Sequence, residues 1–240
     1  MKPLIVANWK LNPETQKEAK ELFDAVKKGV KNAAVEVVIC PPFIYLAELH
    51  GLPLGAQNVG QEEKGAFTGE VSAMQLKDMG VEYALVGHSE RRNKFSETDE
   101  MANQKMQITL KAGLKPILCI GEKEGEDKAG VIDRQITIAL KGISLKELKH
   151  IVIAYEPVWA IGTGKNCGVN ETLSSILLVR KILTNLYKRE AADAMRILYG
   201  GSVKAENSAA YLKEAGTNGL LVGGSSLKAE EFIAIVKSAQ

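Results

Sequence analysis

One stretch of the sequence joins a buried strand to a carboxylate and a glycine-bearing segment: Ile151-Val152-Ile153-Ala154-Tyr155-Glu156-Pro157-Val158-Trp159-Ala160-Ile161-Gly162-Thr163-Gly164-Lys165. Its first five residues are apolar and rich in β-branched side chains, which is typical of a strand buried on both faces. Because Pro157 cannot donate to a sheet ladder, the strand is expected to end at Glu156. The apolar residues and glycines that follow could close over a ligand. Equally, Glu156 could be a surface charge at a strand end and Trp159 a core residue.

Further short apolar runs with the same character are distributed along the whole chain. They are Leu4–Ala7, Val35–Cys40, Leu54–Gln57, Tyr83–Gly87, Pro116–Ile120, Arg196–Gly200 and Gly219–Gly223. Segments with the apolar spacing of amphipathic helices fall between them: Thr15–Val30, Thr98–Ala112, Val131–Leu140, Leu173–Leu186, Ala205–Glu214 and Ala229–Ser238. Ser96 is a candidate N-cap for the second of these helices.

The succession of eight strand-then-helix units predicts an α/β fold with a parallel sheet and helical crossovers. We predict that the sheet closes into a single (β/α)8 TIM barrel, one domain over residues 1–240, because this length is close to the roughly 250 residues typical of that barrel. A doubly wound open sheet is the alternative, but the first strand is not followed by the GxGxxG of its nucleotide-binding form. Closure also removes both edges of the sheet.

Composition and charge narrow the function classes. The chain has 31 Lys and Arg against 29 Asp and Glu, so nothing suggests a nucleic-acid or membrane-surface partner. The N-terminal apolar run is too short for a secretory signal. The three cysteines, Cys40, Cys119 and Cys167, are far apart, and the histidines have no metal-ligand spacing. We therefore expect a reducing, cytoplasmic environment, no disulfide, and no metal or other cofactor.

Four polar or charged side chains stand at or just beyond the ends of predicted strands: Asn8, Lys10, His88 and Glu156. In a (β/α)8 barrel the C-terminal ends of all strands meet at one mouth, where active sites lie. The four groups should therefore converge, which predicts a catalytic site. The alternative is that Lys10 is an ordinary solvated lysine and His88 a structural histidine.

Glycine pairs end the last two predicted strands, Gly200-Gly201 and Gly223-Gly224. Glycine lets backbone N–H groups approach a phosphate closely, and barrel enzymes often bind phosphate after strands seven and eight. We predict that Gly223 and Gly224 contact a phosphate and that Ser202 adds a hydroxyl. Two ordinary turns would also explain the glycines.

These segments, taken with several others, resemble the triosephosphate isomerase family. The matching segments are Ala154–Lys165, Ala7-Asn8-Trp9-Lys10, Gly65-Ala66-Phe67-Thr68-Gly69-Glu70, Val86-Gly87-His88-Ser89-Glu90-Arg91-Arg92, Cys119-Ile120-Gly121-Glu122, Tyr199-Gly200-Gly201-Ser202-Val203 and Leu221-Val222-Gly223-Gly224. They occur in the family's order and run from near the first residue to near the last. The resemblance implies interconversion of dihydroxyacetone phosphate and D-glyceraldehyde 3-phosphate through an enediolate, a step of glycolysis and gluconeogenesis, without a cofactor.

The resemblance also implies a role for each side chain at the mouth. Glu156 would be the general base that takes a proton from carbon. His88 would polarise the substrate carbonyl and move protons between oxygens, as a neutral imidazole beside a helix N-terminus, which is a known feature of this enzyme family. Asn8 and Lys10 would stabilise the oxygen charge, and Glu90 would pair with Lys10 as structural support.

Two loops complete what the resemblance implies. The lid Pro157–Lys165 would close over the substrate, with Gly162 donating a backbone N–H to the phosphate. The loop Gln61–Ser72 would reach into a second subunit of a homodimer, with Thr68 near that subunit's site. Without the resemblance, this loop would be interpreted as a surface Ω-loop.

The sequence departs from the family pattern in two places. Asn166-Cys167-Gly168 replaces the usual residues of the C-terminal lid hinge, which puts the rate of lid opening in question. Gly216-Thr217-Asn218-Gly219 replaces an Asp-rich turn, so we expect a structural ion pair, with Arg180 as the candidate cation, to be missing or relocated.

Two other functions remain open at this point. Another phosphate-binding barrel enzyme, such as a pentose-phosphate epimerase, would share the glycine loops but would not need Lys10, His88 and Glu156 together. A non-catalytic barrel would be expected to lack at least one of the four groups at the mouth, and all four are present.

Overall fold

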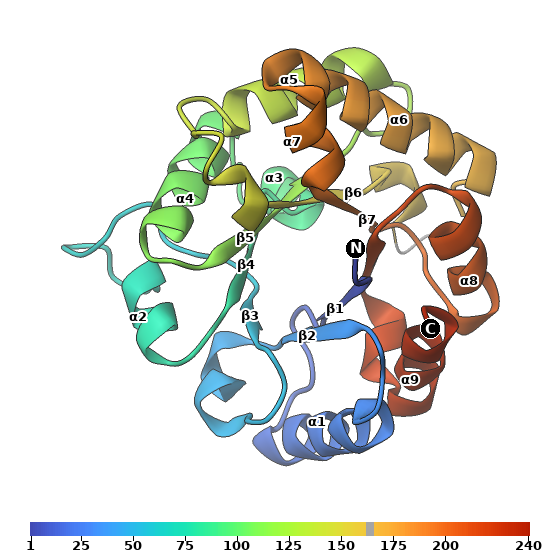
Figure 1. The fold of residues 1–240 in the computed structure, drawn as a ribbon. Helices are drawn as coiled ribbons and strands as arrows, with labels where there is room; N and C mark the ends of the chain where they lie inside the picture. Colours follow the sequence, from blue (N-terminus) through green and yellow to red (C-terminus); the bar gives the residue numbers. More distant parts are fainter. Residues whose placement is uncertain (162–165) are drawn as a thin grey trace.

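The computed structural model describes residues 1–161 and 166–240, in which eight parallel strands form one barrel-shaped sheet with helices around it (Figure 1). The strands are β1 Leu4–Asn8, β2 Glu36–Cys40, β3 Gly55–Ala56, β4 Tyr83–Val86, β5 Lys115–Ile120, β6 Val152–Tyr155, β7 Arg196–Tyr199 and β8 Gly219–Val222. Their order around the sheet is β2-β1-β8-β7-β6-β5-β4-β3. The predicted (β/α)8 barrel is thereby confirmed.

The barrel closes between β2 and β3, where backbone pairing is sparse. Strand β3 has two residues, shorter than the predicted Leu54–Gln57. Between the two strands there is one isolated parallel bridge, Ile39 opposite Leu54, with the Ile39 N–H donating to the Pro53 carbonyl at 3.1 Å. By comparison, β1 pairs with β2 from Leu4 to Asn8 without interruption.

The first five α-helices along the chain begin at residues whose side chains cap them. They are α1 Gln16–Val30, α2 Ala73–Asp78, α3 Ser89–Lys94, α4 Asp99–Lys111, α5 Lys128–Ala139, α6 Val169–Leu186, α7 Arg189–Ala194, α8 Ala205–Glu214 and α9 Ala229–Ser238. The cap of α4 is Thr98, whose hydroxyl accepts the Met101 N–H, and not Ser96 as predicted. Ser96 instead has a φ of 54°, outside the extended geometry of an N-cap. The short helices α2, α3 and α7 have too few turns for a periodic signal and were not predicted.

Two layers of apolar side chains hold the barrel together. Along each strand, alternate residues point into the barrel or outward against the helices, so both faces are buried. The inner layer consists of Leu4, Val6, Val38, Cys40, Tyr83, Leu85, Ile117, Cys119, Val152, Ala154, Leu198 and Leu221. The outer layer is larger and includes aromatic side chains of the helices, such as Phe23 of α1 and Phe232 of α9.

Charged side chains close the end of the barrel where the strands begin. Arg196 donates to Glu36 at 2.5 Å and to the Tyr83 hydroxyl at 3.1 Å, and Tyr83 donates to Glu36. The Lys115 ammonium lies 4.7 Å from the centroid of the Tyr83 ring. These residues start β2, β4, β5 and β7, so the network ties strands across the barrel at the end opposite the predicted site.

Candidate active site

The predicted catalytic groups lie in the wall of one cavity at the C-terminal ends of the strands. Asn8 ends β1, Lys10 follows it, His88 follows β4 and Glu156 follows β6. All four line a cavity of about 210 Å³. The convergence expected from the strand ends is therefore present, whereas the role of each group stays a prediction.

Lys10 is held in an uncommon backbone conformation. Its φ is 54°, in the left-handed region that costs a non-glycine residue roughly 1–3 kcal/mol unless its surroundings fix it. The Asn8 side-chain oxygen accepts the Lys10 N–H at 3.1 Å, and the Gln57 amide donates to the Lys10 carbonyl at 2.8 Å. The Lys10 ammonium lies 2.6 Å from a Glu90 oxygen. Burial raises the pKa of Glu90, but the Lys10 ammonium and other nearby positive charges together lower it by more, so this carboxylate stays charged.

Glu156 is almost fully buried, with 2% of its surface exposed. One carboxylate oxygen lies 3.1 Å from Nε2 of His88, and the other accepts the backbone N–H of Ser89 at 3.2 Å. Behind it, the Glu156 N–H donates to the Ile120 carbonyl at 2.7 Å and fixes the residue to the end of β5. Sequence reasoning did not identify Ser89 as a partner, because a backbone N–H carries no residue-specific signal.

The hydrogen bonds of His88 indicate which ring nitrogen carries the proton. Nδ1 accepts the backbone N–H of Glu90 at 3.2 Å, so the proton of a neutral ring is on Nε2, facing Glu156. Burial lowers the pKa of His88, but the Glu156 and Glu90 carboxylates together raise it by more, so the net shift is upward. A second proton on Nδ1 would, however, point at the Glu90 N–H, which is itself a donor. Because two donors cannot face each other in a hydrogen bond, we assign a neutral ring. The Asn8 amide nitrogen lies 3.2 Å from Nε2.

The predicted phosphate-binding residues Ser202, Gly223 and Gly224 line the same cavity. A Cβ on Gly223 would lie 3.3 Å from Cε of Lys10, and one on Gly200 would lie 2.9 Å from Cγ of Glu156. Glycine at these positions therefore gives the side chains of Lys10 and Glu156 the space that they occupy. Gly162 lies outside the described residues.

The first part of the lid is tied to the barrel by Glu122. The Trp159 indole donates to the Glu122 carboxylate at 3.0 Å, and the Val158 N–H donates to the Glu122 carbonyl at 2.9 Å. The Ser202 hydroxyl donates to the Ala160 carbonyl at 2.7 Å, so the predicted phosphate ligand here contacts the lid. In the sequence, Glu122 is notable only as the last residue of the matching segment Cys119-Ile120-Gly121-Glu122.

The atypical lid hinge is packed against the barrel. Cys167 is buried, and the Tyr211 hydroxyl donates to its carbonyl at 2.7 Å. Burial raises the pKa of the Cys167 thiol to about 11. Burial also raises the pKa of the Cys119 thiol well above its ordinary value, so Cys119 behaves as a packed apolar residue and not as a nucleophile.

The second departure from the family pattern changes the partner of Arg180. Within the described parts of the chain, Arg180 forms no ion pair within 4.0 Å. Its guanidinium donates to the Asn218 side-chain oxygen at 2.7 Å and to the carbonyls of Met195 and Ala192. Burial lowers the pKa of Arg180.

Over the described residues, no three His, Cys, Asp or Glu side chains are grouped as they would be around a metal ion. In the same part of the chain, every helix is too short or too polar to cross a bilayer.

Comparisons with known proteins agree with this geometry. The family model described as triosephosphate isomerase matches residues 3–239. The chain belongs to the triosephosphate isomerase family. It is 46% identical to the triosephosphate isomerase of Alkaliphilus oremlandii over 98% of both chains. It is also 46% identical to that of Symbiobacterium thermophilum, over 99% of this chain and 96% of the relative. The enzyme of Caldanaerobacter subterraneus subsp. tengcongensis is 45% identical over 98% of both chains. None of these matches favours a pentose-phosphate epimerase.

Proposed function

We propose that this chain is a triosephosphate isomerase that interconverts dihydroxyacetone phosphate and D-glyceraldehyde 3-phosphate. The observation that carries the proposal is one cavity lined by a buried carboxylate, an imidazole, an amide and a lysine, with two glycines and a serine beside them. The residues supply what the reaction needs without a cofactor: a base for a C–H proton, donors for an oxyanion, and space for a phosphate.

In the proposed reaction, Glu156 removes a proton from C1 of dihydroxyacetone phosphate while the electron pair of that bond moves toward the C2 oxygen. The Nε2 proton of His88 passes to this oxygen, and His88 then takes the proton of the C1 hydroxyl. Glu156 returns its proton to C2, which gives the aldehyde. Lys10 and Asn8 stabilise the negative oxygen of the enediolate.

Substrate binding requires one rearrangement in the site. The Glu156 oxygen and Nε2 of His88 are 3.1 Å apart, which leaves no room for a substrate carbon between them. We therefore expect the Glu156 carboxylate to turn away from His88 when substrate enters. Ser89 holds the carboxylate in its present orientation through a single N–H bond, which is readily exchanged.

The test is to compare wild type with Glu156→Asp in a coupled assay with triose phosphate. The shorter side chain keeps the charge but withdraws it by about 1 Å, and a displacement of that size can cost roughly 100-fold in rate. The loss should appear in kcat far more than in KM, because the phosphate is held elsewhere. Glu124→Asp, at an exposed carboxylate, is the matched control. A near-normal kcat for Glu156→Asp would remove Glu156 as the base.

We also propose that the chain forms a homodimer through the loop Gln61–Ser72. Apolar side chains around this loop are left exposed, including Phe67 at 48%, Met74 at 57% and Phe95 at 63%. These three line one surface cavity of about 900 Å³. Exposed apolar side chains gathered at one place are typical of an interface. Shortening the loop around Phe67 should give monomers of low activity by gel filtration and assay, and a fully active monomer would contradict the proposal.

A cytoplasmic location and a single domain over residues 1–240 complete the proposal. All three cysteines are free and buried, which suits a reducing compartment.

A further inference from the structure

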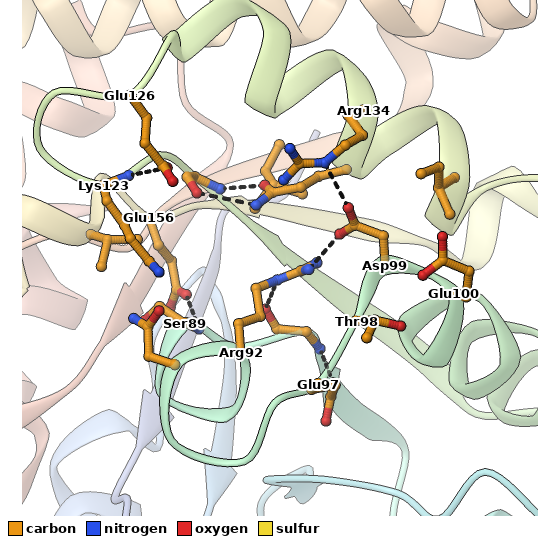
Figure 2. Close-up of a pocket in the computed structure, with 17 residues that line it drawn as sticks. Ser89, Arg92, Glu97, Thr98, Asp99, Glu100, Lys123, Glu126, Arg134 and Glu156 are labelled. Carbon is orange, nitrogen blue, oxygen red and sulfur yellow. Dashed lines mark hydrogen bonds and ion pairs between the residues drawn. The ribbon is translucent and has the colours of Figure 1, made fainter.

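A second cavity lies on the other side of Glu156. It has a volume of about 360 Å³ and is bounded by α3, α4, the segment after β5, and α5 (Figure 2). Glu156 lines both this cavity and the substrate cavity, so the carboxylate stands in the wall between them. The base can therefore be influenced from a side that substrate does not occupy.

Lys123 is the cation in this second cavity that has no carboxylate partner. Its backbone N–H donates to Glu126 at 2.8 Å, and within the described residues its ammonium makes no ion pair within 4.0 Å. Figure 2 shows its side chain extending from the segment after β5 toward the Glu156 carboxylate and Ser89. The segment is fixed beside the base, because the Glu122 carbonyl accepts the Val158 N–H.

The other cations around the cavity each have a carboxylate partner, although two cations share each carboxylate. Arg92 and Arg134 both pair with Asp99, at 2.5 and 3.0 Å. Glu97 is paired with Arg91 at 2.7 Å and with Lys105 at 2.5 Å. The charged and titratable groups around Glu156 from the elements packed against it are Lys10, His88, Glu90, Arg92, Glu97, Asp99, Glu100, Cys119, Lys123, Glu126 and Arg134.

Within the described residues, the Glu156 carboxylate forms no ion pair with a lysine or an arginine within 4.0 Å. Its two contacts are a neutral imidazole and one backbone N–H, although the carboxylate is buried and must be ionised to act as a base. Burial disfavours the charged form of a carboxylate, and a cation at moderate distance restores it. An ammonium beyond ion-pair distance still attracts the carboxylate, because charges are screened less inside a protein than in water.

We propose that Lys123 is a positioning residue for the base, whose ammonium stabilises the charged Glu156 carboxylate from the second cavity. This inference rests on the proposed function, because it gives Glu156 the role of base. Lys123 does not line the substrate cavity, so its effect on the reaction is expected to pass through Glu156.

The test is the pH dependence of kcat/KM at low ionic strength for wild type and Lys123→Gln. Removing the cation makes protonation of the carboxylate easier, so the base is lost at a higher pH and the acid limb moves upward. We expect a shift of roughly 0.3–0.5 pH units, which 0.5 M salt should reduce. Lys123→Glu should shift the limb further, and Lys123→Arg should restore it. The ionisation of the substrate phosphate is the same for every variant, and each profile is divided by the fraction of substrate dianion before the acid limbs are compared.

The control is Lys128→Gln, a lysine five positions along the chain that pairs with Glu171 at 3.1 Å and does not line the cavity. An acid limb that stays in place for both Lys123→Gln and Lys123→Glu would overturn the inference. An equal shift for Lys128→Gln would also overturn it, because the effect would then come from net charge. Either result leaves the proposed function unaffected, because that proposal is tested separately by the kcat of Glu156→Asp.

Discussion

The side-chain amide of Gln57 donates to the carbonyl of Lys10 at 2.8 Å and to the carbonyl of Cys40 at 2.9 Å. One nitrogen thus joins the residue that carries the cation of the site to the last residue of β2. Lys10 needs such a restraint, because its backbone is in the left-handed region.

Gln57→Leu keeps a side chain of similar size and removes both hydrogen bonds. We expect kcat/KM to fall by roughly 10-fold, because a small displacement of a positioned group is costly to the transition state. The loss should exceed any change in Tm. Steady-state kinetics and a thermal melt check this, with Gln107→Leu on the exposed face of α4 as control. Unchanged kinetics would show that Lys10 holds its conformation without Gln57.

The buried carboxylate of Glu97 predicts a pH dependence of stability. Burial raises its pKa, but Lys105 and Arg91 lower it by more, so the folded-state pKa lies below the ordinary 4.5. Its contribution is therefore fully present above pH 4.5 and is lost as pH falls through the folded-state value.

Glu97→Gln should lower the free energy of unfolding by about 3 kcal/mol at pH 7, because two cations lose their carboxylate. The difference from wild type should shrink below pH 4.5, where the wild-type carboxylate is protonated as well. Urea unfolding across pH 3 to 7 measures it, and Glu63→Gln, in the exposed pair with Lys111, should have little effect. A difference that does not vary with pH would contradict the assignment.

Arg180 offers a stabilising substitution. Its guanidinium and the Ile197 N–H both donate to the Asn218 oxygen, at 2.7 and 2.9 Å. Asn218→Asp keeps this acceptor and adds a negative charge opposite the half-buried guanidinium, so we expect a gain of about 1 kcal/mol at pH 7. Thermal melts check it, with the exposed Asn185→Asp as control. A lower Tm would mean that the desolvation of the new carboxylate destabilises the fold by more than its ion pair with Arg180 stabilises it.

The strands and the convergence of the four mouth residues could be predicted because both follow from local pattern. Buried strands appear as apolar runs, and in a parallel barrel every strand end faces the same mouth. The limits of β3 could not be predicted in this way, because the strand consists only of the two residues that pair with β4. The last residue of the predicted strand, Gln57, lies outside it and donates a side-chain hydrogen bond to the Lys10 carbonyl.

The residues that support the site were harder to find. Ser89 contributes a backbone N–H, and Glu122 and Gln57 act on groups 37 and 47 positions away along the chain. Such contacts depend on how distant segments pack, and no spacing in the sequence encodes them. Lys123 is an exposed lysine in a charged segment, so only its position beside the second cavity distinguishes it.

The seam between β2 and β3 gives the barrel a preferred place to open. Transient opening of a fold starts where few hydrogen bonds have to break, and here one backbone bridge and the Gln57 side chain span the joint. Amide protons beside the seam should therefore exchange with solvent sooner than those of β5 or β6. Each opening also frees the carbonyl of Lys10, so a ligand that holds Lys10 in place restrains the joint as well. Occupancy of the mouth and local fluctuation of the barrel wall are in this way two readouts of one equilibrium.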